Sequence, residues 1–400
     1  MLQKLLNLDV RNKKILLRID LNLPIKNGKV IDNTRIIRSL PTIKYLIENQ
    51  AKIIIISHRG RPNGEFDLNA SMAIMADELQ KHVKQVIKFC SDSIGEKALK
   101  SVSKLMPGEI LVLENLRFHK GEEDCDENFT KELAKLGEIY INDTFSCSHR
   151  KHASIFGLPK IMQSVAGFSL IQELENMEKL LNNPKKPFTA IIGGAKISSK
   201  TELLSTLLTK VDNLVIGGAM ANTFLAAQNY NLGQSLVEPN YIENAKIILT
   251  KAKKIGKKIF LPTDLVVAKS NRENVACQIT SIDKIANDDM ALDIGPNSTE
   301  YISSIIKNSN SVIWNGPMGA FENPLFNCST QHLARIISNQ TQHYNLLSVI
   351  GGGDTVSAIK CAGLIDQFTY ISTGGGAFLE WLEYKILPGI EVLQNAYCKS

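Results

Sequence analysis

Short apolar runs alternate with longer amphipathic segments along the chain. The runs have the length of buried strands and end in turn residues, and the segments between them suit helices. This alternation is typical of βαβ units and of a mostly parallel sheet. It predicts strands within residues 13–22, 51–60, 108–117, 138–146, 188–194, 212–218, 257–264, 310–319, 346–353 and 368–376.

The chain is expected to divide near its middle. At 400 residues it exceeds the size at which a single core keeps growing, so two domains are expected. Residues 181–188 contain two prolines and two lysines after a helical stretch, which suits a linker. We predict an α/β fold with two similar-sized domains, each a mostly parallel sheet flanked by helices (Rossmann-like), joined by a hinge. The predicted bounds are 1–180 and 189–385 for the domains, 181–188 for the linker, and 386–400 for a segment returning to the first domain.

The residues that follow the predicted strands differ between the two halves. Ligands of open α/β sheets bind outside the carboxyl ends of the strands, so these residues are candidates for a site. In the second half they are glycines, namely Gly193, Gly194, Gly217, Gly218, Gly316, Gly351 to Gly353 and Gly374 to Gly376. In the first half they are polar or charged, namely Arg18, Asp20, Asn22, His58, Arg59, Arg61, Glu114, Asn115, Arg117, His119, Asn142, Asp143, His149, Arg150 and His152.

The two sets of residues suit different ligands. Guanidinium groups bind carboxylate and phosphate bidentately, so the first half suits a small, highly charged acid. Glycine backbone followed by a helix N-terminus suits the polyphosphate of a nucleotide, because N–H groups then make the contacts. One such turn would be an ordinary tight turn, but five in one domain favour a site. Phosphoryl transfer between the two ligands is the simplest reaction that joins them.

Candidate groups for that transfer lie in the second half. Lys196 and Lys200 follow a strand and two glycines, and they would share one face if a helix began there, although lysines are also common on solvated helix faces. Asp354, followed by Thr355, is predicted to anchor Mg²⁺, which prefers one or two carboxylates together with phosphate oxygens. Such a reaction depends on positioning and charge neutralisation more than on an acid or base.

Composition and charge narrow the class of protein. Apolar residues at 44% and charged residues at 22% are ordinary for a globular protein, and the net charge of +6 is modest. No block of Lys and Arg interleaved with aromatic residues supports nucleic-acid binding. Seven scattered cysteines without a C-x-x-C pair favour free thiols in a reducing compartment, and no apolar stretch approaches the ~18 residues of a membrane span. We therefore expect a cytoplasmic protein with neither nucleic acid nor membrane as a partner.

Other motifs carry weaker hypotheses. Neither of the common nucleotide-binding motifs, G-x-x-x-x-G-K-[ST] or a convincing G-x-G-x-x-G, is present. Composition and motif spacing by themselves therefore predict no more than a two-domain α/β phosphotransferase. His149 and His152 could suggest a metal, but a third ligand is not evident and binding an anion suits them better. Cys147 lies near His149 in sequence, which suggests nucleophilic catalysis by the thiol, although neighbours in sequence need not face each other in space.

Ten motifs in register resemble those of one known family, phosphoglycerate kinase, over nearly the whole chain. They are RIDLNLP, SHRGRPNG, LENLRFHKGEE, NDTFSCSHRKHAS, IIGGAKISSK, IGGAMANTFL, ALDIGP, VIWNGPMGAFE, VIGGGDT and STGGGAFLEWLE. The resemblance implies a monomer that transfers the acyl phosphate of 1,3-bisphosphoglycerate to MgADP in glycolysis, giving 3-phosphoglycerate and MgATP. In-line transfer would follow closure about the hinge.

The resemblance also implies roles for single residues. The glycerate and its phosphate would be bound by Asp20, Asn22, Arg35, His58, Arg61, Arg117 and Arg150. The nucleotide would be bound by Lys200, Gly295, Asn315, Glu322, Gly352, Gly353, Asp354 and Thr355, with Asp354 at the Mg²⁺. The phosphoryl group in flight would be surrounded by Arg35, Lys196, Gly375 and Gly376. Only the resemblance singles out Arg35, because DNTRIIRSL otherwise looks like an ordinary helix start.

Four residues depart from the pattern of that family. Phe378 stands where a small residue is usual, and Tyr384 replaces a common glycine, so the packing after the last glycine turn is in question. Arg59 occupies a usually apolar position and Ser199 a commonly acidic one. None of the four is assigned to the phosphoryl group, so we predict an active enzyme whose kinetics these residues can alter.

Three other functions stay open on the sequence. The nearest is a kinase for another small phosphorylated acid, which a substrate panel would separate. A nucleotide-dependent scaffold protein could keep the fold without turnover, but Lys196, Arg35 and Asp354, whose loss would favour it, are all present. A nucleic-acid binder would give a salt-sensitive DNA shift that phosphoglycerate does not compete away.

Overall fold

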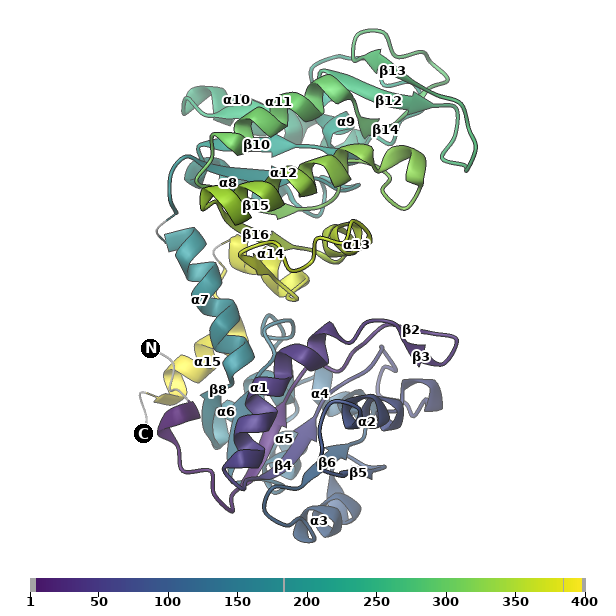
Figure 1. Ribbon diagram of the computed structural model, residues 1–400. Helices are drawn as coiled ribbons and strands as arrows, with labels where there is room; N and C mark the ends of the chain where they lie inside the picture. The colour runs from purple at the N-terminus through teal and green to yellow at the C-terminus, as the bar shows by residue number, and fades with distance from the viewer. Residues whose placement is uncertain (1–4, 183, 384, 398–400) are drawn as a thin grey trace. The chain divides into compact units, whose positions relative to one another are not determined.

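The computed structural model describes residues 5–182, 184–383 and 385–397 (Figure 1). The chain forms two compact units, Met1–Glu175 with Ile386–Ser400, and Asn176–Lys385. The boundary falls within helix α7 (Phe168–Asn182), so the predicted linker lies in the second unit. The predicted C-terminal segment belongs to the first unit, and its last three residues lie outside the described residues. No helix in the described parts of the chain is long and apolar enough to cross a membrane.

A six-stranded sheet of parallel strands forms the centre of the first unit. Its strand order is β5-β6-β4-β1-β7-β8. The strands are β1 (Lys14–Arg18), β4 (Lys52–Ile56), β5 (Ile87–Cys90), β6 (Ile110–Leu113), β7 (Ile139–Asn142) and β8 (Gln163–Ala166). The central strands read as continuous apolar runs because both faces of a parallel sheet are covered. The short strands β2 (Ile25–Lys26) and β3 (Lys29–Val30) form a separate antiparallel hairpin.

Helices cover this sheet and complete the core of the first unit. Helix α1 buries Ile36, Ile43 and Leu46 in a cluster with apolar residues of β1 and β4. The C-terminal helix α15 packs on β8 and α6. The helices are α1 (Thr34–Glu48), α2 (Ala73–Gln80), α3 (Gly95–Ser103), α4 (Lys120–Glu123), α5 (Glu127–Ala134), α6 (Leu158–Ile161) and α15 (Pro388–Tyr397). Single turns of 3₁₀ or π helix are η1 (Leu5–Asn7), η2 (Leu68–Ala70), η3 (Leu116–Phe118) and η4 (Ala153–Gly157).

The second unit has a parallel sheet of the same size and a small additional sheet. The main sheet has the order β11-β10-β9-β15-β16-β17, and the additional antiparallel sheet has the order β13-β12-β14. The strands are β9 (Phe188–Ile192), β10 (Asn213–Ile216), β11 (Lys258–Phe260), β12 (Asp264–Ala268), β13 (Cys277–Ser281), β14 (Met290–Ile294), β15 (Ser311–Asn315), β16 (Leu347–Gly351) and β17 (Tyr370–Ile371). All residues of β9 and β15 are buried, which places these two strands at the centre of the core.

The helices of the second unit follow its strands as the alternating pattern predicts. The fully buried Trp314 of β15 lies in the core cluster with apolar residues of α11 and α12. The helices are α8 (Thr201–Lys210), α9 (Gly218–Ala227), α10 (Ile242–Lys254), α11 (Pro296–Lys307), α12 (Cys328–Tyr344), α13 (Gly353–Cys361) and α14 (Gly376–Leu382). Single 3₁₀ turns are η5 (Pro239–Tyr241) and η6 (Pro324–Phe326).

The α/β fold class predicted from the sequence is confirmed. Each of the predicted strands is present, as β1, β4, β6, β7, β9, β10, β11, β15, β16 and β17. Several strands that the sequence analysis missed carry polar or exposed residues, as in IKFC of β5, QSVA of β8 and CQITS of β13. Their apolar pattern is too weak to separate them from loops, so only pairing with a neighbour identifies them as strands. The sequence analysis also missed β12 and β14, although DLVVA and MALDI are largely apolar and buried.

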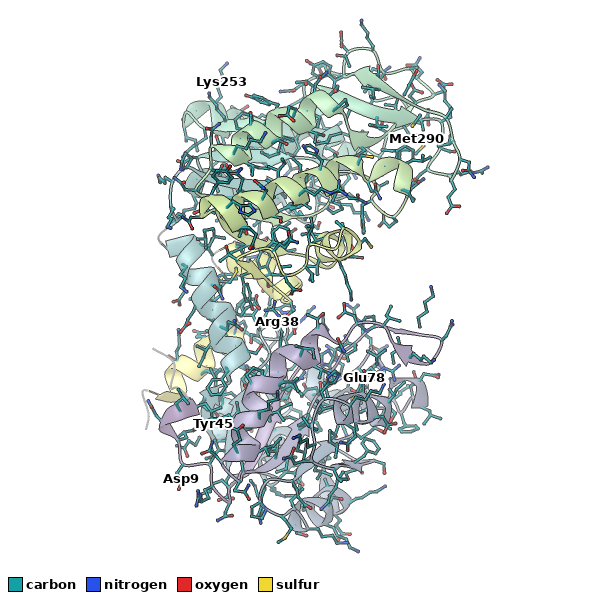
Figure 2. The ribbon with its side chains drawn as sticks, viewed as in Figure 1. Asp9, Arg38, Tyr45, Glu78, Lys253 and Met290 are labelled. Atoms are coloured by element: carbon teal, nitrogen blue, oxygen red, sulfur yellow. The ribbon has the colours of Figure 1, made fainter. Side chains whose placement is uncertain are left out.

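Helix α7 begins against helix α1. The ring of Tyr45, a residue of α1 labelled in Figure 2, meets that of Phe168 edge-on, with centroids 5.3 Å apart. The Thr42 hydroxyl accepts a hydrogen bond from the Phe168 N–H at 3.0 Å. Asp143, which directly follows β7, accepts the next two N–H groups of α7 at 2.8 and 3.2 Å. One buried carboxylate therefore caps the helix that leads out of the first unit.

Replacing Asp143 by Asn should change how the stability of the fold depends on pH. Burial raises the pKa of this carboxyl from 3.8 to about 7, against the hydrogen bonds that lower it. A pKa raised on folding adds stability that is fully present below the unfolded pKa and is lost as pH rises through the folded one. We therefore compare the free energy of unfolding of the wild type with that of Asp143→Asn. The difference, wild type minus variant, should decrease as pH rises from about 4 to about 7. Urea unfolding at several pH values measures this difference, with the exposed Asp9→Asn as control; a flat difference would contradict the prediction.

Candidate active site

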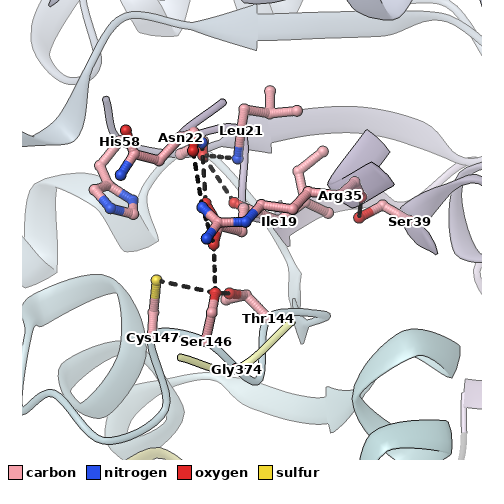
Figure 3. A network of polar contacts seen from close by, with 12 residues as sticks. Ile19, Leu21, Asn22, Arg35, Ser39, His58, Thr144, Ser146, Cys147 and Gly374 are labelled. Atoms are coloured by element: carbon pink, nitrogen blue, oxygen red, sulfur yellow. Dashed lines mark hydrogen bonds and ion pairs between the residues drawn. The ribbon is translucent and has the colours of Figure 1, made fainter. Parts of the chain in front are cut away.

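The polar residues of the first half gather at one edge of the first sheet. They follow β6, β4, β1 and β7, which are neighbours in the strand order. Arg35 of α1 forms an ion pair with Asp20 (Nη1 to Oδ2, 3.0 Å) and donates to the Asn22 carbonyl at 2.8 Å. The Ser146 hydroxyl also donates to Asp20 (Figure 3). Residues from the segment after β1, from α1 and from the loop after β7 thus form one hydrogen-bonded group.

Asp20 is ionised in this group. Burial acts to raise its pKa, but the charge of Arg35 and hydrogen bonds from Ser146 and the Asn22 N–H outweigh burial. The net effect holds the pKa of Asp20 below its ordinary value. Asp20 therefore positions the Arg35 guanidinium rather than acting as an acid.

A buried arginine orients His58. Arg18, the last residue of β1, places Nη2 at 2.9 Å from His58 Nδ1 and also donates to the Ser57 hydroxyl at 3.3 Å. A guanidinium can only donate, so His58 Nδ1 accepts and the ring proton lies on Nε2. Burial, followed by the charge of Arg18, holds the pKa of His58 well below its ordinary value. His58 is therefore a neutral donor through Nε2.

Arg18 is linked through Ser154 to a buried carboxyl group. Arg18 Nε donates to Ser154 Oγ at 3.1 Å, and Ser154 Oγ donates to Glu122 Oε1 at 2.6 Å. Burial raises the pKa of Glu122, and the charge of Arg18 opposes this rise. The sequence analysis named Arg18 only among the polar residues at the strand ends and did not single out Ser154 or Glu122. A single arginine at the end of an otherwise apolar strand was the available signal, but its partners lie more than 100 positions away.

The remaining predicted cations of the first unit differ in their surroundings. Arg117 donates to the Gly60 carbonyl at 2.8 Å and lies 3.2 Å from Glu123. Arg61 is exposed and, with Asn22, lines a cavity of about 340 Å³. Arg150 is also exposed, and its side chain makes no hydrogen bond or ion pair with any described residue. The structure therefore joins Arg117 and Arg61 to the group but leaves Arg150 at its margin.

Arg59, one of the departures, lines the same cavity as Arg61. Its guanidinium donates to the Ser71 carbonyl at 3.2 Å, and partial burial lowers its pKa. The hydrogen bond gives this polar residue a place at a position that is usually apolar in the family the sequence resembles. Arg59 therefore adds a cation beside Asn22 without displacing any predicted substrate residue.

The histidines of the loop after β7 are neutral. Burial, with Arg150 second, lowers the pKa of His149 to about 4, and burial with Arg117 lowers that of His152 to about 3. The sulfur of Cys147 lies 3.7 Å from a nitrogen of Arg18, and no hydrogen bond in the described part of the chain joins it to His149. Within the described residues, no three His, Cys, Asp or Glu side chains are placed to hold a metal. Neither a metal site nor a Cys–His pair is supported here.

The glycine turns of the second unit follow five adjacent strands, β10, β9, β15, β16 and β17, but their glycines serve two purposes. A Cβ on Gly193 would lie 2.1 Å from the Pro317 carbonyl, and one on Gly316 would lie 2.3 Å from that of Gly193. These glycines allow neighbouring turns to pack backbone against backbone. A Cβ on Gly353 or Gly375 would meet no atom within 4 Å. These latter turns leave room for a ligand.

Hydrogen bonds from buried side chains hold the turn after β16 in place. The Asn315 side chain donates to the Gly351 carbonyl at 2.9 Å, and the buried Thr355 hydroxyl accepts the Gly316 N–H at 2.6 Å. Gly352 has φ of +95°, which only glycine adopts readily, and α13 begins at the next residue. Asp354 is exposed in the first turn of α13. A single exposed carboxylate at this place fits Mg²⁺ shared with phosphate oxygens.

The expectation that Lys196 and Lys200 share a helix face is wrong. Helix α8 begins at Thr201 with Lys200 as its N-cap, and Lys196 lies exposed in the preceding turn. The fully buried Ile197 holds this turn in place. Lys200 donates to the Gly193 carbonyl at 2.8 Å. Burial lowers the pKa of Lys200 to about 8, and the carboxylate of Asp354 opposes this shift, so the two predicted groups interact.

Two predicted nucleotide residues stand apart from this cluster. Gly295 is the N-cap of α11, where a Cβ would lie 2.3 Å from the Asp264 side chain. Glu322 is exposed in the loop after β15. No hydrogen bond or ion pair among the described residues joins either of them to Asn315 or Asp354.

Two of the other departures from the family pattern are Ser199 and Tyr384. Ser199 is exposed and donates to the Lys196 carbonyl at 3.2 Å, and Tyr384 lies outside the described residues.

Comparison with known proteins gives one consistent result. A model of the phosphoglycerate kinase family matches residues 5–385. The chain belongs to the phosphoglycerate kinase family. Phosphoglycerate kinase of Orientia tsutsugamushi (strain Ikeda) is 49% identical over 395 residues, covering 98% of this chain and 97% of that one. Phosphoglycerate kinase of Rhizobium meliloti is 47% identical over 387 residues, with 97% of each chain covered.

Solved structures of phosphoglycerate kinases share the fold. The structure from Coxiella burnetii has a TM-score of 0.89 and 38% identity and covers 99% of both chains. The structure from Pyrococcus horikoshii has a TM-score of 0.87 and 29% identity and covers 99% of this chain and 100% of that one. The family confirms the predicted resemblance and activity, a glycolytic transfer of phosphate between 1,3-bisphosphoglycerate and ADP. The roles of single site residues stay predictions.

Removing Arg18 should destabilise the fold, because the buried carboxyl group of Glu122 depends on its charge. We expect Arg18→Met to lower the free energy of unfolding by about 3 kcal/mol, because Glu122 then loses the cation that does most to offset its burial. Adding Glu122→Gln should restore at least about 1 kcal/mol, because the charge that needed compensation is gone. Urea unfolding at neutral pH measures both variants. Equal stabilities of the single and double variants would show that Arg18 does not compensate Glu122.

Proposed function

We propose that this protein carries out the reaction of its family with the acid bound by the first unit and the nucleotide by the second. The acyl phosphate of 1,3-bisphosphoglycerate passes to MgADP, giving 3-phosphoglycerate and MgATP. The observation that carries the proposal is the contrast between the two carboxyl edges. One holds a group of arginines around Asp20 and His58, and the other holds open glycine turns beside Lys200 and Asp354.

The acid site of the first unit relies on arginine for its charge. We assign binding of the glycerate and its phosphate to Asp20, Asn22, Arg35, His58, Arg61, Arg117 and Arg150. His58 is neutral, as its low pKa requires, so it can donate Nε2–H to an oxygen of the ligand. Arginine stays charged at any physiological pH and matches carboxylate and phosphate in geometry.

The nucleotide site of the second unit relies on backbone N–H groups and one lysine. We assign it to Lys200, Gly295, Asn315, Glu322, Gly352, Gly353, Asp354 and Thr355. Asn315 and Thr355 act by holding the turn, since both are buried in hydrogen bonds to glycine backbone. Asp354 would hold Mg²⁺, which neutralises charge on the phosphate oxygens when it is bound. Lys200 adds a positive charge beside the same turn.

The transfer itself needs no general base. In the ATP-consuming direction the nucleophile is the carboxylate of 3-phosphoglycerate, which is ionised at neutral pH. We assign neutralisation of the phosphoryl group to Arg35, Lys196, Gly375 and Gly376. A helix N-terminus and a guanidinium suit the charge spread over the equatorial oxygens. In-line transfer after hinge closure stays a prediction, which small-angle scattering tests by looking for compaction only when both ligands are bound.

A glycolytic role also supports the expectations about cellular location, oligomeric state and ligands. We propose a cytoplasmic monomer whose ligands are 3-phosphoglycerate or 1,3-bisphosphoglycerate and ADP or ATP, with neither nucleic acid nor membrane as a partner. Sedimentation of the purified chain with and without its ligands tests the monomer.

The decisive experiment is ATP formation from ADP, Mg²⁺ and 1,3-bisphosphoglycerate by the purified protein. Lys196→Ala should lower kcat by about 100-fold or more while ADP still binds, because a contact made with the phosphoryl group in flight acts on the transition state. The exposed Lys253→Ala serves as the matched control. Turnover that survives in Lys196→Ala would remove Lys196 from the reaction, and no turnover by the wild type would overturn the proposed activity.

Nucleotide affinity should fall as pH rises through the pKa of Lys200. That pKa is about 8 without ligand, and nucleotide phosphates should raise it, because they favour the charged form. ADP should therefore bind most tightly below this pH and weaken above it, by up to about tenfold per pH unit. Calorimetric titration measures this, with Lys200→Arg as the variant that stays charged. The same pH profile in both proteins would show that Lys200 does not contact the phosphates.

A further inference from the structure

Phe378 occupies an unusual place beneath two of the glycine turns. It lies near the start of α14 and is fully buried. A Cβ on Gly351, the last residue of β16, would lie only 2.3 Å from a carbon of the Phe378 ring. The aromatic ring therefore packs directly on the backbone of Gly351, and no larger residue could stand there.

Both partners of this contact lie next to proposed site residues. Gly351 is followed by the turn that leads into α13 and Asp354, and its carbonyl accepts the hydrogen bond from Asn315. Phe378 follows Gly375 and Gly376 at the start of α14. Packing of the ring on Gly351 therefore connects the turn assigned to the nucleotide with the turn assigned to the phosphoryl group.

Helix α14 depends on packing for its position. It has seven residues, which is too short for a helix to be stable without packing. Its end is linked to α8 by an ion pair of Lys385 with Glu202 at 2.7 Å, but both side chains are largely exposed, and such pairs contribute little. Of its three buried residues, Ala377, Phe378 and Leu382, the phenylalanine has the largest side chain.

We propose that Phe378 is a positioning residue, which sets Gly375 and Gly376 at the correct place relative to the turn of Gly352 to Asp354. The inference rests on the proposed function, because it concerns the alignment of the phosphoryl group with the nucleotide. Phosphoryl transfer depends on in-line geometry, so a shift of about 1 Å in one turn can cost about 100-fold in rate while each ligand still binds.

The competing explanation is that Phe378 only fills the core. Truncation would then cost stability as for any buried phenylalanine, with no particular effect on catalysis. Phe224 of α9 offers a matched control, because it is a fully buried phenylalanine of the same unit and has no assigned role in the site.

The experiment compares Phe378→Ala, Phe378→Leu and Phe224→Ala with the wild type. Phe378→Ala should lower kcat by about tenfold or more and change the Kd for ADP by less than about threefold. Phe378→Leu, which refills most of the volume, should recover most of kcat. Phe224→Ala should lose a similar amount of thermal stability but keep kcat within about twofold. Hydrogen exchange at residues 374–377 should be faster in Phe378→Ala and unchanged in Phe224→Ala.

Several outcomes would overturn the inference. They are an equal loss of kcat in the two alanine variants, a loss of ADP affinity as large as the loss of kcat, or unchanged hydrogen exchange at residues 374–377 in Phe378→Ala. Should Phe378→Ala fail to fold, Phe378→Leu must still show lower kcat and faster exchange than Phe224→Leu. A wild type without turnover would instead overturn the proposed function, which separates the two failures.

Discussion

Parallel pairing with aligned ends is the constraint on which the rest of each unit depends. Arg18 at the end of β1 pairs with Ile56 of β4 and with Asn142 of β7. In the second unit Asn315 at the end of β15 pairs with Ile192 and Gly351. All of these strands therefore end at the same edge of their sheet, and the residues that come after them must share that edge. One edge collects arginines and the other collects glycines because the two halves of the sequence place different residues after their strands.

Burial decides which charges the first edge keeps. The histidines there have low pKa values because an imidazolium would be desolvated beside arginines. Asp20 stays ionised because Arg35 and several hydrogen bonds outweigh its burial. The positive charge of the edge is thus carried by guanidinium groups, which cannot lose a proton at physiological pH. A site of this kind binds a multiply charged acid with little dependence on its own titration.

Close packing decides what each glycine does at the second edge. Gly193 and Gly316 are glycines because neighbouring turns touch there, and Gly351 is a glycine because a phenylalanine ring lies on it. The turns at Gly353 and Gly375 are open. Glycine-rich turns therefore serve partly to build the edge and partly to leave room at it. Lys200, whose pKa burial lowers to about 8, lies beside the open turn of Asp354.

The sequence by itself determined the fold class, ten of the strands, the polar and glycine-rich character of the two edges, and the family. These features are local or depend on motif order, so periodicity and residue type are enough to predict them. It did not predict β5, β8 and β13, which contain polar or exposed residues, or the turn that replaces a helix at Lys196. It also missed β12 and β14, although both are largely apolar.

Only the tertiary structure decided how residues distant in sequence act together. The link from Arg18 through Ser154 to Glu122 spans more than 100 positions, and the contact of Phe378 with Gly351 joins two turns. Such contacts depend on which side chains meet when the sheet closes its core, and no local pattern encodes that. Arg35 shows the same limit, since its pairing with Asp20 results from the packing of α1 on the sheet.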